Sequence, residues 1–223
     1  MPDSEKKQQL VDCIRMLERA DYIDHNGHCS IRRDATSLYI NSGASIRSTL
    51  TADDIVAINL DGERVEGTAR PPLEYHIHSE IFRARPDINA VAHTHPKWST
   101  LLTMTGHRLK PVYAQGVLVA DSQLLDTPMS VNTREMGERL AAALGVKHTV
   151  LLKAHGVVAA GTDMRECFAL AAYVEENAYR QYMAMQIGEP YEFSQDEQQA
   201  CREKLWTPGL FQKTWDYYYS KLG

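Results

Sequence analysis

Three histidines in two short segments of this chain have the types and spacing to bind one metal ion. The segment Asn89–His95 is an apolar run that ends in a His-x-His pair, with a proline directly after it. If this segment is a strand, its side chains alternate between faces, so His93 and His95 point the same way with their Cα atoms about 7 Å apart. His155 follows a second apolar run, Val150–Leu152. Three histidines with an open fourth position are a ligand set typical of catalytic metal sites.

A second His-x-His pair, His76 and His78, is predicted not to bind metal. It lies in a segment where Leu73, Ile77 and Ile81 recur every four residues, which indicates a helix. Side chains two positions apart on a helix do not face each other, so the same pattern has a different meaning here.

The composition is that of an ordinary globular protein. The chain has 223 residues, of which 43% are hydrophobic and 24% charged, which favours one domain with a full core. A net charge of −5 without a basic cluster argues against nucleic acid and anionic membranes as partners. No apolar run approaches the roughly 18 residues of a membrane span, and the polar segment 1–9 is unlike a signal peptide. We therefore expect a cytoplasmic protein, and its four scattered cysteines are expected to be reduced thiols.

The periodicity predicts helices at both ends of the chain around a strand-rich middle. A helix is expected over 9–17, another carrying Glu74, a third after Pro96, a fourth over 133–144 and a long one from about 163 to 187. Besides the strand with the histidine pair, strands are expected over 37–40, 55–60, 63–66, 112–119, 150–152 and 157–160. This order predicts a mixed α/β domain, and it is not regular enough to require a parallel sheet.

The order of these motifs resembles the class II aldolase/adducin family. Glu74 precedes the His93-x-His95-Pro motif, and the Lys153-x-His155-Gly motif precedes the long helix. The likeness covers about 27–187 and implies a single αβα domain over 1–223 with a largely antiparallel central sheet. It also implies a homotetramer whose active sites lie between neighbouring subunits.

The same resemblance implies the roles of the site residues. His93, His95 and His155 would bind one divalent metal ion per subunit, zinc or manganese, with cobalt or iron as further possibilities. Glu74 would be the acid–base residue and could also touch the metal. A metal held by neutral histidines can polarise a carbonyl or hydroxyl, and a nearby carboxylate can then move the proton. Tyr113 lies where aldolases of the family often carry a tyrosine near the leaving group; simple packing is the open alternative.

The chain departs from the family's phosphate-binding pattern. His28 replaces the asparagine of a Gly-Asn-x-Ser turn, Ser42 and Gly43 keep a second turn, and Pro72–Leu73 replaces a pair of serines. Because a phosphate dianion needs several donors, we expect a substrate without phosphate. His28, Ser42, Gly43 and Arg47 are the expected substrate contacts.

These departures favour a metal-dependent carbon–carbon lyase that decarboxylates a hydroxy-aromatic or hydroxy-keto carboxylate. The alternative is an aldolase or epimerase acting on a sugar phosphate, and a minor one is a non-catalytic, adducin-like assembly module. The aromatic tail from about 195 is expected either to pack on its own core or to cover a neighbour's site.

Overall fold

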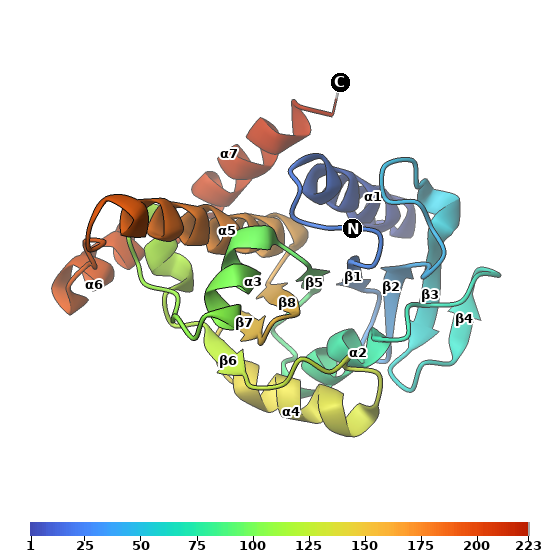
Figure 1. The fold of residues 1–223 in the computed structure, drawn as a ribbon. Helices are drawn as coiled ribbons and strands as arrows, with labels where there is room; N and C mark the ends of the chain where they lie inside the picture. The colour runs from blue at the N-terminus through green and yellow to red at the C-terminus, as the bar shows by residue number, and fades with distance from the viewer. Residues whose placement is uncertain (223) are drawn as a thin grey trace.

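The computed structural model, described here for residues 1–222, contains one eight-stranded sheet with helices on both faces (Figure 1). The strands are β1 (His28–Arg32), β2 (Ser37–Asn41), β3 (Ile55–Asn59), β4 (Arg64–Glu66), β5 (Ala90–Thr94), β6 (Gln123–Leu125), β7 (Thr149–Leu152) and β8 (Gly156–Gly161). Their order across the sheet is β4-β3-β2-β1-β5-β8-β7-β6, and only the β6–β7 pair is parallel. The expected αβα domain with a largely antiparallel sheet is confirmed.

Seven α-helices and two short 3₁₀ helices accompany this sheet within residues 1–222. They are α1 (Asp3–Arg19), α2 (Tyr75–Ala84), α3 (Lys97–Met104), α4 (Arg134–Leu144), α5 (Met164–Ile187), α6 (Gln195–Leu205), α7 (Pro208–Tyr219), η1 (Ala52–Asp54) and η2 (Ala114–Val119). The long helix α5 begins where the Asp163 carboxylate accepts hydrogen bonds from the Arg165 and Glu166 amides. None of the helices in this part of the chain is long and apolar enough to cross a membrane.

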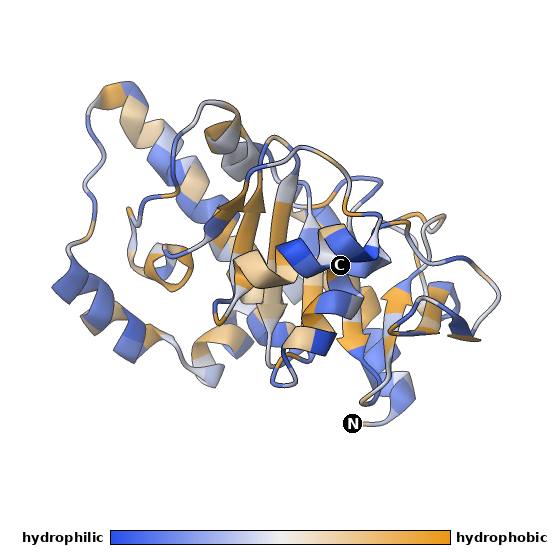
Figure 2. Ribbon diagram, turned by 90° about the horizontal axis from the view of Figure 1, so that it is seen from below, coloured by the Kyte–Doolittle hydropathy of each residue, from blue (hydrophilic) through white to orange (hydrophobic). Residues whose placement is uncertain are grey.

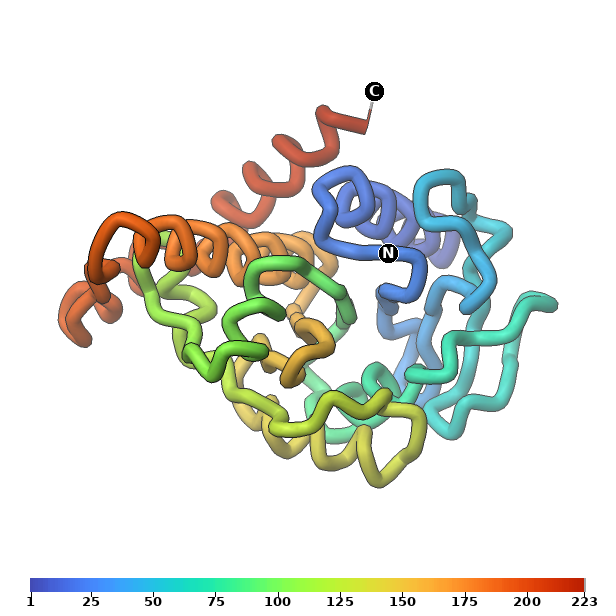
Figure 3. Tube along the Cα trace, viewed as in Figure 1, coloured from blue at the N-terminus to red at the C-terminus, as the bar shows by residue number. Residues whose placement is uncertain are grey.

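Side-chain alternation along the strands divides the core into two layers. Ala90 and Ala92 of β5 face the layer with α1, α5 and α7, whereas Val91 faces the layer with α2 and α4. Figure 3 shows α2 and α4 side by side below the sheet in that view, and Figure 2 shows hydrophobic strands between helices that carry hydrophilic residues. By the same alternation His93 lies on the α2 side, where Glu74 begins that helix.

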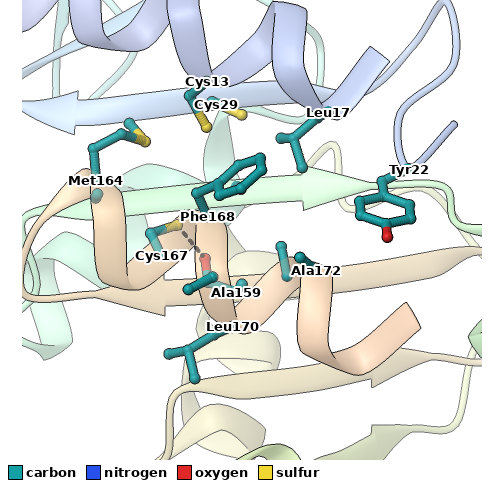
Figure 4. Close-up of a cluster of buried hydrophobic side chains, with 14 of the residues drawn as sticks. Cys13, Leu17, Tyr22, Cys29, Ala159, Met164, Cys167, Phe168, Leu170 and Ala172 are labelled. Atoms are coloured by element: carbon teal, nitrogen blue, oxygen red, sulfur yellow. Dashed lines mark hydrogen bonds between the residues drawn. The ribbon is translucent and has the colours of Figure 1, made fainter. Parts of the chain in front are cut away.

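The core layer formed with α1, α5 and α7, which we call the upper layer because these helices lie at the top of Figure 1, contains three of the four cysteines. Cys13 of α1, Cys29 of β1 and Cys167 of α5 are buried near Phe168 (Figure 4). All four cysteines are free, as expected. Burial raises the pKa of the Cys13 and Cys167 thiols well above the ordinary value, so these side chains act as apolar packing.

Some expected elements are wrong or were missed. The segment 112–119 is not a strand, because residues 114–119 form η2 and pack on α5. A β-carbon at Gly116 would lie 2.0 Å from the Asn177 side-chain oxygen, so this turn depends on a contact with a distant helix. The strands β1 and β6 were not expected, and Leu73 is 81% exposed rather than part of the buried stripe of α2.

The aromatic tail packs on its own chain. Phe211 and Trp215 of α7 are buried in the upper layer, where the Trp215 ring lies edge-on to Phe168 with centroids 5.7 Å apart. The Tyr218 ring also contacts Phe168, at 5.2 Å. Phe168 therefore joins α7 to α5.

We predict that Phe168→Ala lowers the free energy of unfolding by about 3–5 kcal/mol, because it leaves a cavity among packed aromatic rings. Urea denaturation monitored by circular dichroism measures this loss. Phe168→Leu, which keeps most of the volume, is the control and should lose clearly less. Equal losses for the two variants would show that the ring contacts do not hold α7.

Candidate metal centre and active site

Four side chains from separate parts of the chain converge at the end of β5. Glu74 lies at the N-terminus of α2, His93 is in β5, His95 lies one residue beyond it, and His155 lies in the turn between β7 and β8. Each offers one ligand atom, and these four atoms lie within 4.8 Å of one another. The cluster predicted from the spacing of the histidines is therefore present, and it is consistent with a divalent metal ion.

The sheet register produces this convergence. β5 lies between β1 and β8, with His93 opposite His28 on one side and Val158 on the other. The β5–β8 pairing brings the two strand ends very close together. A β-carbon added at Gly156 would lie only 2.2 Å from the Thr94 carbonyl oxygen. Only glycine allows this approach, and it places His155 beside the histidine pair.

Hydrogen bonds at the outer nitrogens orient two of the imidazoles. His93 Nδ1 lies 3.1 Å from the Val157 carbonyl oxygen, and His95 Nδ1 lies 2.8 Å from the Asp24 carboxylate. Because these oxygens can only accept, both Nδ1 atoms carry the hydrogen and both Nε2 atoms present lone pairs. The His155 Nδ1 atom is buried and has no hydrogen-bond partner in residues 1–222.

The inner nitrogens then define a site for a cation. The His93 and His95 Nε2 atoms lie 3.0 Å apart, and the assigned tautomers leave no hydrogen between them. Two facing lone pairs repel unless a cation lies between them, and this separation is close to the roughly 3.3 Å expected for two tetrahedral ligands with metal–nitrogen distances near 2.0 Å. The donor set therefore fits a metal ion.

Glu74 completes the cluster as a carboxylate. Its Oε2 atom lies 3.5 Å from His93 Nε2, and its Oε1 atom lies 3.8 Å from His155 Nε2 and accepts a 2.8 Å hydrogen bond from the Val131 amide. Burial alone would raise the pKa of Glu74, but the His28 imidazole that faces its carboxylate holds this pKa well below its ordinary value. With a relative exposure of 8%, Glu74 is not a simple surface glutamate.

Burial lowers the pKa of the neighbouring imidazoles. The pKa of His28 falls to about 4 and those of His95 and His155 also fall, in each case chiefly through burial. Neutral imidazoles bind metal directly because no proton must first leave.

The residues expected to contact substrate separate into two places. Gly43 and Arg47 line a cavity of about 620 Å³ that His95 also lines. Ser42 is buried beside this cavity, and its carbonyl oxygen accepts a hydrogen bond from the Ser45 amide. His28 instead lies at the cluster, with its Nε2 atom 3.7 Å from the Glu74 carboxylate.

Tyr113 is not brought to the cluster within one chain. It lines a different cavity, of about 390 Å³, between α5 and α7. The Arg180 guanidinium lies over its ring at 4.5 Å, and burial raises the pKa of its hydroxyl. A role at the metal cluster would require a neighbouring subunit.

The roles of two residues, Asp24 and His78, were missed in the sequence. Asp24, which orients His95, reads in the sequence as an ordinary turn residue. His78 was expected to lack a metal role, and it lies outside the four-residue cluster, but it is fully buried and contacts His28. Its position four residues after Glu74, on the same face of the helix, was the available signal.

The comparisons with known proteins identify the family. Residues 8–182 match the model of the class II aldolase and adducin N-terminal domain, so the chain belongs to this family. With the intact histidine and glutamate cluster, it is a metal-dependent lyase of the class II aldolase type.

Three of the similar proteins are aldolases by name. The chain is 30% identical over 184 residues to the 5-methylthioribulose-1-phosphate/5-deoxyribulose-1-phosphate aldolase of Rhodospirillum rubrum, covering 82% of each chain. It is 28% identical to the L-fuculose phosphate aldolase of Escherichia coli, covering 91% of this chain and 95% of that one. A solved structure of L-fuculose 1-phosphate aldolase is 25% identical with a TM-score of 0.83, covering 92% of this chain and 97% of that chain. The favoured decarboxylase interpretation gains no support from these relatives.

We predict that Asp24→Asn weakens metal binding about 10- to 100-fold, because the amide holds His95 less firmly and reduces its basicity. Isothermal titration of the metal-free protein with zinc measures the affinity. Asp21→Asn is the matched control, because Asp21 lies nearby but pairs with Lys97 instead. An unchanged affinity in Asp24→Asn would mean that His95 needs no orienting partner.

Proposed function

We propose that this protein is a metal-dependent aldolase that cleaves a phosphorylated ketose. The observation that carries the proposal is the cavity of about 620 Å³ that reaches from His95 to Arg47. It provides a metal ligand at one end and a buried guanidinium at the other, which suits a substrate with metal-binding oxygens and a phosphate. The aldolase names of the relatives support the same substrate class.

The metal would be held by His93, His95 and His155, one ion per subunit. These histidines suit zinc, and manganese, cobalt or iron would also bind, so the native metal stays a prediction. A divalent cation here supplies a Lewis acid for the substrate's carbonyl and hydroxyl oxygens.

Cleavage of a 1-phosphorylated ketose breaks the bond between C3 and C4. The C4 hydroxyl loses its proton, its oxygen forms the aldehyde carbonyl, and the electron pair of the broken bond moves to C3 and is delocalised toward the C2 oxygen. C3 then takes up a proton. The reaction therefore needs charge stabilisation at the C2 oxygen and a group that moves protons.

Glu74 is the residue that we assign to proton transfer at C3. Its carboxylate is held by the Val131 amide and lies beside the histidine cluster. The low pKa keeps it ionised, so it accepts a proton before it can return one. It could also bind the metal when no substrate is present.

Arg47 is the residue that we assign to the phosphate. Its Nε atom donates to the Gly27 carbonyl at 2.7 Å, and its Nη1 atom donates to Ser45 Oγ at 2.9 Å, so the guanidinium is fixed in the cavity wall. A rigid guanidinium suits phosphate better than a flexible ammonium. This charge offsets the hydroxyls absent at Pro72–Leu73, from which we had expected a substrate without phosphate.

Tyr113 is proposed to act at the cluster of a neighbouring subunit. Its own chain places it between α5 and α7, so this role depends on the homotetramer that the family resemblance implies. Both the tetramer and the role of Tyr113 stay predictions.

We predict that the zinc-loaded protein releases an aldehyde from at least one of L-fuculose 1-phosphate, 5-deoxyribulose 1-phosphate and 5-methylthioribulose 1-phosphate. Removal of the metal with a chelator should abolish turnover, and added metal should restore it. A coupled assay for the aldehyde measures the rate. Release of carbon dioxide from ortho-hydroxy aromatic carboxylates, without cleavage of any sugar phosphate, would reject the proposal in favour of decarboxylation.

Glu74→Gln provides the control for this assay. It keeps the three histidines and an oxygen at the site, so bound metal should persist while turnover falls about 10²- to 10⁴-fold. A variant that loses metal as well would assign Glu74 to metal binding rather than to proton transfer.

We predict that Arg47→Gln lowers kcat/KM for the sugar phosphate about 10- to 100-fold, because one charged hydrogen bond to phosphate is lost. The comparison substrate is the same ketose without phosphate. Loss of the Gly27 and Ser45 contacts would impair both substrates alike, whereas loss of phosphate recognition impairs only the phosphorylated one. Equal impairment would exclude Arg47 from phosphate binding.

A further inference from the structure

A chain of three buried polar side chains leads from the sheet to the metal cluster. Ser30 of β1 and His78 of α2 have no exposed surface, and His28 of β1 is 1% exposed. Ser30 Oγ lies 2.6 Å from His78 Nδ1, and His78 Nε2 lies 2.7 Å from His28 Nδ1. The remaining ring nitrogen, His28 Nε2, is buried without a hydrogen-bond partner in the described part of the chain.

We infer that the hydrogen bonds from Ser30 through His78 hold His28 with its hydrogen on Nε2, so that His28 donates a hydrogen bond to a substrate oxygen at the cluster. Ser30 and His78 are then positioning residues that act through His28. The identity of the acceptor rests on the proposed function, but the position of the hydrogen does not.

The hydrogen-bonded chain Ser30–His78–His28 can run in only two directions, because each of its two contacts contains one hydrogen. In one direction Ser30 donates to His78 Nδ1, His78 Nε2 donates to His28 Nδ1, and His28 carries its hydrogen on Nε2. In the other direction every hydrogen is reversed and His28 Nε2 presents a lone pair.

Electrostatics at the cluster selects between the two directions. His28 Nε2 lies 3.7 Å from the Glu74 carboxylate. A lone pair there would face a negative oxygen, whereas an N–H group faces it favourably. The arrangement that begins with a hydrogen donated by Ser30 is therefore the stable one.

The need for His78 follows from the chemistry of imidazole. An asparagine amide always carries hydrogens on its nitrogen, but a neutral imidazole donates from Nε2 only when its other nitrogen accepts. His28 stands where the resemblance led us to expect asparagine. The chain through His78 and Ser30 gives this histidine the donor character that an amide has by itself.

The donor complements the other groups of the site. Glu74 is an ionised acceptor, and the Nε2 atoms of His93 and His95 present lone pairs. His28, by contrast, can donate a hydrogen bond from its N–H group without transferring that proton to the substrate. An oxygen that gains negative charge during cleavage is the acceptor such a donor stabilises most.

Neutron diffraction of the zinc-loaded protein in heavy water tests the hydrogen position directly, since X-ray data at ordinary resolution do not show it. We expect deuterium on Nε2 of both His28 and His78, and none on His28 Nδ1. Deuterium on His28 Nδ1, with or without one on Nε2, would overturn the assignment. This result does not depend on which substrate the protein cleaves.

Paired variants of His78 test the functional consequence. His78→Phe removes the donor to His28 and should lower kcat/KM about tenfold, whereas His78→Gln keeps an N–H group near the same place and should recover most of the rate. Ser30→Ala is a milder change and should lower kcat/KM by a smaller factor. His28→Phe should lower kcat/KM about 10²-fold. His76→Gln is the control and should leave kcat/KM unchanged, because His76 lies on the same helix but is not part of the hydrogen-bonded series. Metal content should stay constant throughout.

Two kinetic outcomes would overturn the inference. Unchanged kcat/KM in His28→Phe would show that its N–H group contacts no substrate. Equal losses in His78→Phe and His78→Gln would show that His78 acts only by packing. If the wild-type protein cleaves no sugar phosphate, the proposed function fails, while the neutron experiment still decides the tautomer.

Discussion

The site depends on a repulsion that the fold creates and a cation relieves. Antiparallel pairing on both sides of β5 fixes the backbone at His93, and a backbone carbonyl and a carboxylate take the outer hydrogens of His93 and His95. Two lone pairs must then face each other at 3.0 Å. Because surrounding groups fix both tautomers, neither ring can relieve this repulsion by moving its hydrogen to the other nitrogen. The site is therefore preorganised for a metal ion.

The parts of the site that follow from local periodicity could be predicted from the sequence. The alternation of strand residues placed His93 and His95 together, and helical spacing separated His76 from His78. What could not be predicted depends on contacts between distant segments. The apolar run 112–119 has strand character, yet Gly116 packs against Asn177 of α5 and the segment forms a 3₁₀ helix. Asp24 and Ser30 likewise gain their roles only through residues far along the chain.

The expectation of a substrate without phosphate gains no support from the relatives, and the reason is related. Missing hydroxyls at Pro72–Leu73 are visible in the sequence, but the position of the Arg47 charge in the wall of the cavity that His95 also lines is visible only in the folded protein. Leu73 points into solvent with 81% exposure, while Arg47 is 3% exposed and is held in the cavity wall by Gly27 and Ser45. A count of the donors in one motif therefore leaves out a buried positive charge that lies elsewhere in the cavity wall.

The close backbone approach at Gly156 makes the metal centre vulnerable at a residue that has no functional group. A single added methyl group would meet the Thr94 carbonyl oxygen at 2.2 Å and His95 Cδ2 at 3.0 Å, forcing β5 and β8 apart where the ligands converge. In a survey of random substitutions, this glycine should therefore be as intolerant as the histidines themselves. Intolerance to substitution alone would not distinguish a residue that binds the ion from one that only leaves room for it.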